Sequence, residues 1–445
     1  MERRDGREVL AMARATRASD EWDQIGWGRP SKRATAYSPA QRIMAVLAGL
    51  ACGLRGVASG NTWLRTSSAL RGLFGGRFPD QGTIHRWLHA TSAEQAAKMR
   101  SHLHRLVRRQ GRIRDVLRRG TRLFVDVDAQ GLVARGERFE GAAWGKMEGG
   151  FDRGYQRFTA YAGQTQEVLD EFLRPATATL LSDLPELVSG LTEIFDESER
   201  CRVVIRADAH GGTVKNIRSI QQAGFSWLCR MQSRLGIERI RRECCGEPGT
   251  VFTVVDSHGA ERRQECWTIP EWTIRQSRTV EVRTRAVVYR EVVEGKEFWL
   301  VLLTDLELTA EALWRCYYER GGTIEEYYDQ SERCFHLEVM RTGRRAGLDA
   351  LHALMGVCWN LTQWSLEELE LPPVSRPGAS RGVWRRATDL DRSGVLQRAS
   401  LCGLRLHRPP RSFQLEVEDT VGSAESQAWR KWLKGCIQIR LPLVA

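Results

Sequence analysis

Several features are missing from this 445-residue sequence, and each absence removes a class of protein. No apolar run approaches the roughly 18 residues that a membrane-spanning helix needs, so we expect no membrane segment. The N-terminal residues Met-Glu-Arg-Arg-Asp-Gly-Arg are not followed by an apolar segment, so we expect no signal peptide and a cytoplasmic protein. With 42% hydrophobic and 27% charged residues, the composition is globular and leaves room for roughly two to four domains.

The cysteines lack the spacing of a metal site or of a disulfide framework. There are 11 of them, no Cys-x-x-Cys pair occurs, and apart from the adjacent Cys244 and Cys245 they are scattered. An odd number in a chain without an expected signal peptide indicates reduced thiols. His85 and His89 stand four residues apart, but no acidic or Cys partner is near, so we interpret them as packing residues or phosphate contacts.

Positive charge is abundant and unevenly placed. The formal net charge is +12, and residues 1–119 alone hold 23 Lys and Arg against 9 Asp and Glu, a net of +14 that leaves the remainder near −2. Part of this charge forms a basic stripe on an expected helix over residues 92–118, at Arg105, Arg108, Arg109 and Arg112. Such a concentration favours a region that binds nucleic acid over a surface that merely solubilises the chain.

Composition and periodicity divide the chain into four expected parts. The first residues are polar and rich in Arg and Gly, which is typical of a flexible arm. Ser38-Pro39 then marks a helix start, with Ser as the N-cap and Pro in the first turn. The parts are a basic flexible arm (1–37), a helical DNA-binding domain (38–119), an α/β domain (120–370) with a β-rich insertion (240–304), and a C-terminal arm and helix (371–445).

Apolar strands alternate with helices in the α/β part. The expected strands are 121–128, 155–162, 202–208 and 225–230, with helices at 184–196 and 213–223. Residues 250–304 change character and contain successive strands separated by turns. Helices resume at about 308–320, 323–334 and 345–369, and a last one is expected near 424–435. The N-terminal part predicts helices at 40–54 and 61–74 and the long helix at 92–118.

Three acidic residues stand in informative local contexts. Asp128 ends the apolar run Leu-Phe-Val-Asp-Val-Asp, Asp208 ends Val-Val-Ile-Arg-Ala-Asp, and Glu325 lies in a helix-like segment. A buried carboxylate at the end of a strand is costly unless a cation compensates for it. Two divalent metal ions would do so, and three carboxylates can hold such a pair for phosphoryl transfer. Asp126 is an alternative to Asp128, because side chains two residues apart on a strand share a face.

Four segments between about residues 40 and 370 resemble the DDE transposases of bacterial insertion sequences. They are Phe78-Pro-Asp-Gln-Gly-Thr-Ile-His-Arg-Trp-Leu88, Val125-Asp-Val-Asp128 with its Gly-rich sequel, Val204-Ile-Arg-Ala-Asp208, and Leu302-Leu-Thr-Asp-Leu306 followed by Tyr317-Tyr-Glu-Arg320 and Ile324-Glu325. The resemblance implies an α/β fold in which a ribonuclease-H-like catalytic domain is interrupted by an all-β insertion. It also implies a helical N-terminal DNA-binding domain.

The last motif of that family reads Tyr, two residues, Arg, three residues, Glu, six residues, Lys, and this chain departs from it. Tyr317 and Arg320 fit, but Glu325 follows Arg320 after four residues. Glu326 is the alternative, since it has the family's distance to a basic residue, Arg333. We prefer Glu325 because it follows an Ile, as in the family. The first motif also departs, because Gln130 stands where the family has Thr.

The resemblance implies a cut-and-paste transposase with Asp128, Asp208 and Glu325 as catalytic residues and ligands of two Mg²⁺ (or Mn²⁺) ions. Its partners would be double-stranded DNA, in the form of terminal inverted repeats and target DNA, and a second copy of the chain with which it forms a homodimer. The protein would be associated with the nucleoid and would not bind a membrane. Tyr317 and Arg320 would contact DNA phosphates, while packing or an intrahelical salt bridge is an equally good interpretation. A displaced base would stack on Trp267 or Trp272. The alternatives are a catalytically inactive, domesticated DNA-binding protein and a ribonuclease-H-like nuclease.

Overall fold

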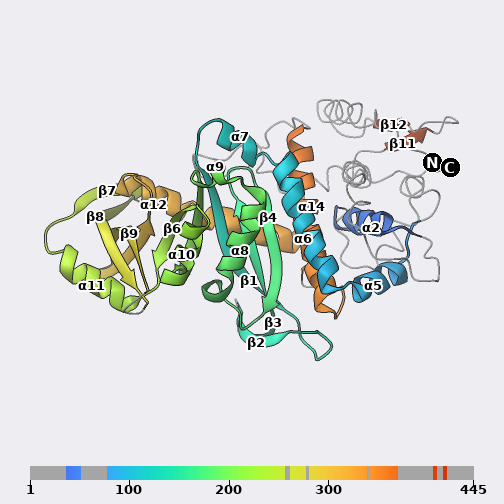
Figure 1. Ribbon diagram of the computed structural model, residues 1–445, viewed down its shortest axis with the longest axis horizontal. Coiled ribbons are helices and arrows are strands. Elements are labelled where there is room, and N and C mark those ends of the chain that lie inside the picture. The colour runs from blue at the N-terminus through green and yellow to red at the C-terminus, as the bar shows by residue number, and fades with distance from the viewer. Residues whose placement is uncertain are drawn as a thin grey trace.

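The computed structural model describes residues 37–51, 78–147, 149–255, 261–276, 280–337, 341–368, 404–407 and 414–417. These residues form a mixed α/β fold around one large sheet (Figure 1). No helix among them is both long and apolar enough to span a bilayer. The expected helices at 61–74 and 424–435 and the two expected arms lie outside the described residues.

The large sheet has ten strands in the order β2-β3-β1-β5-β6-β10-β9-β8-β7, and β4 also pairs with β3. The strands are β1 (Leu123–Val133), β2 (Ala143–Met147), β3 (Gly150–Ala162), β4 (Glu167–Pro175), β5 (Val203–Gly212), β6 (Ser226–Met231), β7 (Thr250–Val255), β8 (Glu261–Arg275), β9 (Glu281–Val293) and β10 (Lys296–Thr304). A separate two-stranded sheet joins β11 (Leu404–His407) to β12 (Gln414–Val417).

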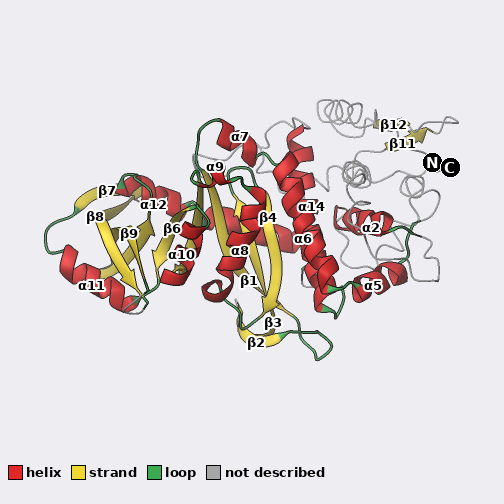
Figure 2. Ribbon diagram, viewed as in Figure 1, coloured by secondary structure: helices red, strands yellow, loops and turns green. Residues whose placement is uncertain are grey.

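Strand direction changes across the large sheet. β3 runs antiparallel to β1, whereas β1, β5 and β6 are mutually parallel. β10 then pairs antiparallel with β6, from Leu302 opposite Arg230 to Thr304 opposite Leu228. The strands of the expected insertion therefore continue the main sheet instead of forming a sheet of their own. Figure 2 shows β7, β8 and β9 at one end of the molecule and β1, β3 and β4 near its middle.

Helices surround this sheet, some of them packed on its faces and others packed on neighbouring helices. They are α2 (Pro39–Ala51), α5 (Gln81–Ala90), α6 (Ala93–Gln110), α7 (Ile113–Arg118), α8 (Leu180–Ile194), α9 (Glu197–Arg200), α10 (Val214–Gln222), α11 (Arg234–Cys244), α12 (Ala310–Tyr318), the π-helical turn η2 (Gly321–Glu325), α13 (Glu326–Phe335) and α14 (Arg345–Glu368). Apolar residues of α8 and α10 share one core with Val203 and Ile205, while Leu313 and Trp314 of α12 pack with Val204 on the other face. Figure 1 shows α6 and α14 side by side next to β4.

Most of the predicted elements are confirmed where the structure describes them, and local chemistry explains their ends. Ser38 and Gln41 form a reciprocal cap at the start of α2, with N–H to side-chain oxygen distances of 2.8 and 3.2 Å. Asp80 caps α5, because its carboxylate accepts the N–H of Thr83 at 2.6 Å. His85 and His89 stack at 6.0 Å on an exposed face of α5. Strands β2, β4 and β8 and helix α11 are among the elements that were not predicted.

The expected helix 92–118 is divided at Gly111, and a buried carboxylate explains the break. The backbone N–H groups of Arg112 and Ile113 donate to Glu167 at 2.9 and 3.0 Å, so this β4 side chain satisfies the free donors that open α7. A Cβ at position 111 would lie 2.4 Å from the carbonyl oxygen of Val107, so only glycine allows this close turn. The burial of Glu167 raises the pKa of its carboxyl group, and its hydrogen bonds oppose that shift.

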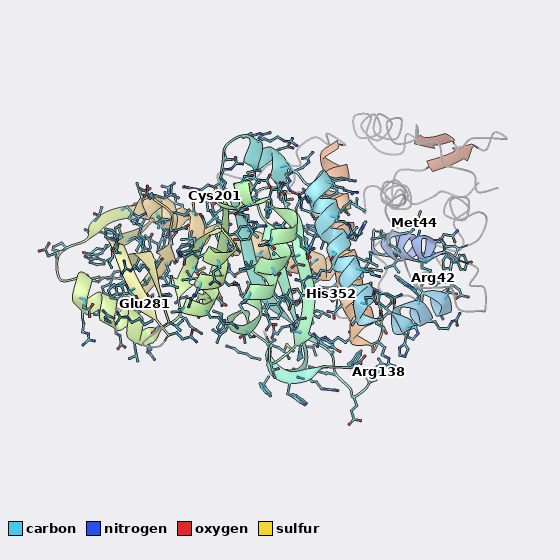
Figure 3. The ribbon with its side chains drawn as sticks, viewed as in Figure 1. Arg42, Met44, Arg138, Cys201, Glu281 and His352 are labelled. Carbon is cyan, nitrogen blue, oxygen red and sulfur yellow. The ribbon has the colours of Figure 1, made fainter. Side chains whose placement is uncertain are left out.

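Two further acids of β4 hold helices to the sheet. Asp170 accepts two hydrogen bonds from Arg100 of α6, at 2.7 and 2.6 Å. Glu171 pairs with Arg157 of β3 at 2.8 Å and with His352 of α14 at 2.9 Å, and it accepts the hydroxyl of Tyr327 at 2.7 Å. Figure 3 places His352 in the interior of the molecule. Paired in this way, the buried carboxylates join α6, α13 and α14 to one strand.

Candidate catalytic site

The site starts from two neighbouring parallel strands. The register of β1 and β5 runs from Leu123 opposite Val203 to Val127 opposite Ala207. The next residue on each strand is Asp128 and Asp208, so both carboxylates leave the sheet side by side on one face. Both are partly accessible, with side chains 23% and 35% exposed. The predicted pair of strand-end acids is therefore brought together.

Asp128 pairs with a guanidinium group. Arg320 Nη2 lies 2.8 Å from Asp128 Oδ2, and the backbone N–H of Ala129 donates to Oδ1 at 2.9 Å. Burial raises the pKa of the Asp128 carboxyl group, Arg320 opposes this, and the charges of Asp208 and Glu325 raise it further. Asp208 and Glu325 are thus both close enough to Asp128 for their charges to act on it.

Asp126 is closed off from the site. Its carboxylate is fully buried and receives Arg206 of β5 at 2.6 and 2.8 Å, and the hydroxyl of Thr323 also donates to it. Because Arg206 and Thr323 occupy both of its oxygens, this acid serves to attach the π turn to the sheet. Asp128, with the freer carboxylate, is the better ligand candidate of the two.

Glu325 ends the π-helical turn η2, and this turn accounts for the unusual motif spacing. A π turn closes hydrogen bonds over one more residue than an α-helical turn, so it takes up a single extra residue in a helix. The additional residue between Arg320 and Glu325 lies in that turn. Ile324 is buried, and Glu325 is exposed beside it. Glu325 therefore stays near the strand carboxylates.

Glu326 differs from Glu325 in its surroundings. It is exposed on the first turn of α13, where it accepts the side-chain amide of Gln330 at 2.9 Å. Glu325 is the one whose charge contributes to the raised pKa of Asp128. This difference favours Glu325 as the third acid.

A model of the family described as "Transposase DDE domain" matches residues 119–361, which is more than half of the chain. The chain belongs to this family. A search of curated proteins found no match. A cryo-EM structure of a piggyBac transposase synaptic complex with hairpin DNA is similar, with a TM-score of 0.40 and 12% identity over 98% of this chain and 84% of that one. That similarity is too low to establish a shared fold.

Tyr317 and Arg320 of this DDE transposase lie close to the acids. Arg320 is buried, donates to the carbonyl oxygen of Val127 at 3.3 Å, and pairs with Asp128, so neither an intrahelical salt bridge nor an exposed phosphate contact describes it here. Tyr317 is half-buried, and burial raises the pKa of its hydroxyl to about 12, with Arg320 opposing and Asp208 adding to the shift. Its hydroxyl is therefore neutral at physiological pH.

The predicted basic stripe is not one continuous surface on the transposase. Arg108 pairs with Asp196 at 2.6 Å and donates to the carbonyl oxygen of Glu193 at 3.2 Å. Arg112 is half-buried, while Arg105 and Arg109 are exposed on α6. Arg105 has no ion pair with any residue that the structure describes, so it is the arginine most available to a polyanion.

The tryptophans proposed for base stacking already have partners. Trp267 stacks on Trp299 with ring centroids 5.6 Å apart, and its indole N–H donates to the carbonyl oxygen of Glu247 at 2.8 Å. Trp272 is buried, and the Arg239 guanidinium lies 4.9 Å from its ring centroid. In this arrangement Trp272 is buried, and one face of the Trp267 ring is already covered by Trp299.

The donor set suits hard divalent cations. Within the described ranges, no three His, Cys, Asp or Glu side chains are grouped tightly enough to hold a metal ion. Carboxylate oxygens are nevertheless the ligands that Mg²⁺ prefers, and the charges of Asp208 and Glu325 both raise the pKa of the Asp128 carboxyl group. Arg320 supplies part of the positive charge that these carboxylates require.

Sequence reasoning missed the residues that organise the acids. Arg206 precedes Asp208 by two positions, so strand periodicity would have placed it on the same face. The ion pair of Arg320 with Asp128 joins a helix end to a strand, and no local signal in the sequence predicts it. The contact of Thr323 with Asp126 likewise depends on the path of the π turn.

Proposed function

We propose that this DDE transposase cleaves DNA and joins DNA strands by metal-dependent phosphoryl transfer at Asp128, Asp208 and Glu325. The observation that supports the proposal is that Asp128 and Asp208 follow neighbouring positions on two parallel strands, while the charges of Asp208 and Glu325 both act on Asp128. The membership in the transposase family supports the same reading. We also propose that the sheet is ribonuclease-H-like and that the helical N-terminal region binds DNA.

The surrounding residues position the acids. Asp128 and Asp208 are each fixed by a backbone N–H, that of Ala129 and that of His210, both at 2.9 Å. Asp126, Arg206 and Thr323 hold the π turn, and with it Glu325, against β1. Two Mg²⁺ or Mn²⁺ ions held by Asp128, Asp208 and Glu325 would activate the attacking water or 3′-hydroxyl and stabilise the leaving oxygen.

We further propose cut-and-paste transposition on double-stranded DNA, with the terminal inverted repeats of an insertion sequence as donor ends. Two ends must be cut and joined to one target, so a homodimer on DNA supplies one active site for each end. Light scattering of the protein with and without end DNA tests this assembly. A complex of one protein with one end that still joins strands would contradict it.

A single substitution tests the site. Asp208→Asn removes one anionic ligand but keeps the shape of the side chain, so Mg²⁺-dependent cleavage should be lost while gel-shift binding of DNA stays within about twofold. Glu325→Gln should abolish cleavage in the same way, and Glu326→Gln is the matched control that should remain active. Joint loss of binding and cleavage in Asp208→Asn would remove the support for its ligand role.

An inactive, domesticated DNA-binding protein remains the second candidate, because Asp128 is ion-paired with Arg320. Mg²⁺-dependent cleavage by the wild-type protein excludes that function, and DNA binding without cleavage supports it. A strand-transfer assay separates a transposase from a ribonuclease-H-like nuclease, since only the transposase joins the cut ends to a target.

A further inference from the structure

The β2–β3 hairpin presents two large aromatic side chains to solvent. Trp144 is 59% exposed and Phe151 is 73% exposed. Their rings stack, with centroids 6.2 Å apart and planes 14° from parallel. Exposed aromatic clusters usually mark an interaction site, because burying such rings on a partner is strongly favourable.

Cationic residues share this surface with the aromatic rings. In the register of the hairpin, Trp144 lies opposite Arg153 and Lys146 lies opposite Phe151. Residues two apart on a strand and residues directly opposite share a face, so these four side chains form one surface, here called the hairpin face. Lys146 is exposed and makes no ion pair with a described residue, whereas Arg153 also donates to the carbonyl oxygen of Gly136.

The opposite face of the hairpin is packed against the body of the protein. A Cβ at Gly145 would lie 2.2 Å from the carbonyl oxygen of Ala176, and a Cβ at Gly154 would lie 2.0 Å from that of Leu132. Met147, on the same side, is buried. Because Gly145 and Gly154 lack a Cβ, the backbone of the hairpin can approach the neighbouring backbone closely on this side. The hairpin therefore packs against the protein on one face, and the hairpin face is directed outward.

The hairpin face lies on the same side of the sheet as the catalytic acids. Asp128 is opposite Thr159 on β3, and the register continues without a shift to Gly154. By alternation, Thr159, Arg153 and Phe151 share one face, with Phe151 about 26 Å along the strand from Thr159. Tyr327 and Ser331 of α13 cover the intervening Arg157. Figure 1 shows the hairpin extending beyond the helices at the lower edge of the molecule, and Figure 3 shows Arg138 directed outward beside it.

We propose that the hairpin face binds unpaired bases of a DNA strand that leads away from the catalytic site. Bases would stack on Trp144 and Phe151, and Lys146 and Arg153 would lie next to the phosphates. Aromatic rings interleaved with cations suit single-stranded nucleic acid, since every base offers a ring face and every nucleotide a negative charge. The inference rests on the proposed function, because it takes the DNA substrate as the ligand.

The test compares two DNA probes on the full-length protein. One is a duplex with a single-stranded tail that carries 2-aminopurine, and the other is the same duplex with a blunt end. The double variant Trp144→Ala/Phe151→Ala should bind the tailed probe about 10- to 100-fold more weakly and lose the quenching of 2-aminopurine fluorescence. Its affinity for the blunt probe should change by less than about twofold. Phe298→Ala, at an equally exposed aromatic residue of β10, is the control and should behave like the wild type.

The outcomes separate this inference from the proposed function. A double variant that binds and quenches the tailed probe like the wild type overturns the inference, and so does an equal loss on both probes. Mg²⁺-dependent cleavage by the wild-type protein, measured in parallel, reports on the proposed function alone. A wild-type protein that binds neither probe overturns both.

Discussion

Arg320 takes part in the electrostatics of the site. Its guanidinium pairs with Asp128, and burial, which would lower its pKa, is outweighed by the charges of Asp128 and Asp126, so the pKa stays above its usual value. A permanent positive charge thus stands where three carboxylates converge. Because removing one partner of a buried pair leaves the other uncompensated, the acids without Arg320 would depend on another cation.

Replacing this arginine should make stability depend on metal. Arg320→Ala should lower the free energy of unfolding by roughly 2–3 kcal/mol without Mg²⁺, a value reduced from that of a fully buried pair because Asp128 is partly exposed. Millimolar Mg²⁺ should raise the melting temperature of the variant more than that of the wild type, as differential scanning fluorimetry can measure. Arg315→Ala, which removes an exposed pair with Glu311, is the control. Equal Mg²⁺ responses in all three proteins would contradict the prediction.

His104 is a buried charge with two acidic partners. Its ring nitrogens lie 2.8 Å from Asp170 and 2.9 Å from Glu193. Burial lowers the pKa of the imidazole and Arg100 lowers it further, but Asp170 and Glu193 outweigh them and raise it to about 9. The folded protein therefore binds this proton more tightly than the unfolded chain.

The raised pKa predicts a loss of stability in alkali. The contribution of His104 is complete below the unfolded value of about 6.5 and is lost as the pH rises through about 9, in total roughly 2–3 kcal/mol. Chemical denaturation between pH 6 and pH 9.5 should show this decline in the wild type and in the exposed control His89→Gln. His104→Gln should be less stable at pH 6 and should show a flatter profile. A decline as steep as that of the wild type would assign the effect to other groups.

The π turn η2 is the element that accommodates the non-standard spacing of the motif. Gly322 is exposed, and a Cβ there would meet no atom within 4 Å, so the extra residue occupies open space. The turn is fixed at Thr323 by Asp126 and at buried Ile324 by the core. The sequence departs from the family spacing at this point, and the fold absorbs the departure locally.

Deleting Gly322 should therefore be tolerated. The deletion converts the π turn into an α-helical turn, after which the glutamate follows Arg320 at the regular spacing and remains on the same side of the helix. Mg²⁺-dependent cleavage should stay within about tenfold of the wild type. Deleting Gln330 from α13 is the matched control, because it rotates part of a regular helix by about 100° and should abolish cleavage. Equal activity in the two deletions would show that the π turn has no special role.

Apolar runs in the sequence predicted the two strands that carry Asp128 and Asp208. Other elements were not predicted, because they contain charged residues that the fold buries. β1 and β5 were evident because Val and Ile fill them. β4 was missed because Glu167, Asp170 and Glu171 resemble the polar residues of a loop, whereas each is buried against a partner far away in the sequence. α11 was missed because it has few apolar residues, and one of them, Leu235, is exposed.

The candidate site, like the fold, was predictable from the sequence only in part. Strand periodicity sufficed to bring Asp128 and Asp208 together, and the family motif pointed to Glu325. The ion pair of Arg320 with Asp128 and the closure of Asp126 by Arg206 were not predictable, because both depend on which strands and turns become neighbours. Sequence patterns therefore pointed to the candidate carboxylates but not to the groups that hold them.

At the scale of the whole molecule, α6 belongs to the same core as the catalytic sheet. Its buried residues Leu103 and Leu106 pack with those of α14 and α8, and Arg100 and His104 bind Asp170. Part of the basic N-terminal region is therefore anchored to the body that carries the acids. DNA held by α6 would be fixed in position relative to the catalytic site.

This anchoring makes the exposed face of α6 a place to test DNA binding in the full-length protein. The logarithm of the binding constant should fall linearly with the logarithm of the salt concentration, because each phosphate contact releases counterions, with a slope of about −0.9 per contact. Arg105→Ala should weaken binding and reduce the slope by about 1, since this side chain is exposed and has no ion pair with a described residue. Arg108→Ala is the matched control on the same helix, and its pairing with Asp196 should leave the slope nearly unchanged. Fluorescence anisotropy over a salt series measures both slopes, and equal slopes for Arg105→Ala and the wild type would exclude a phosphate contact at this position.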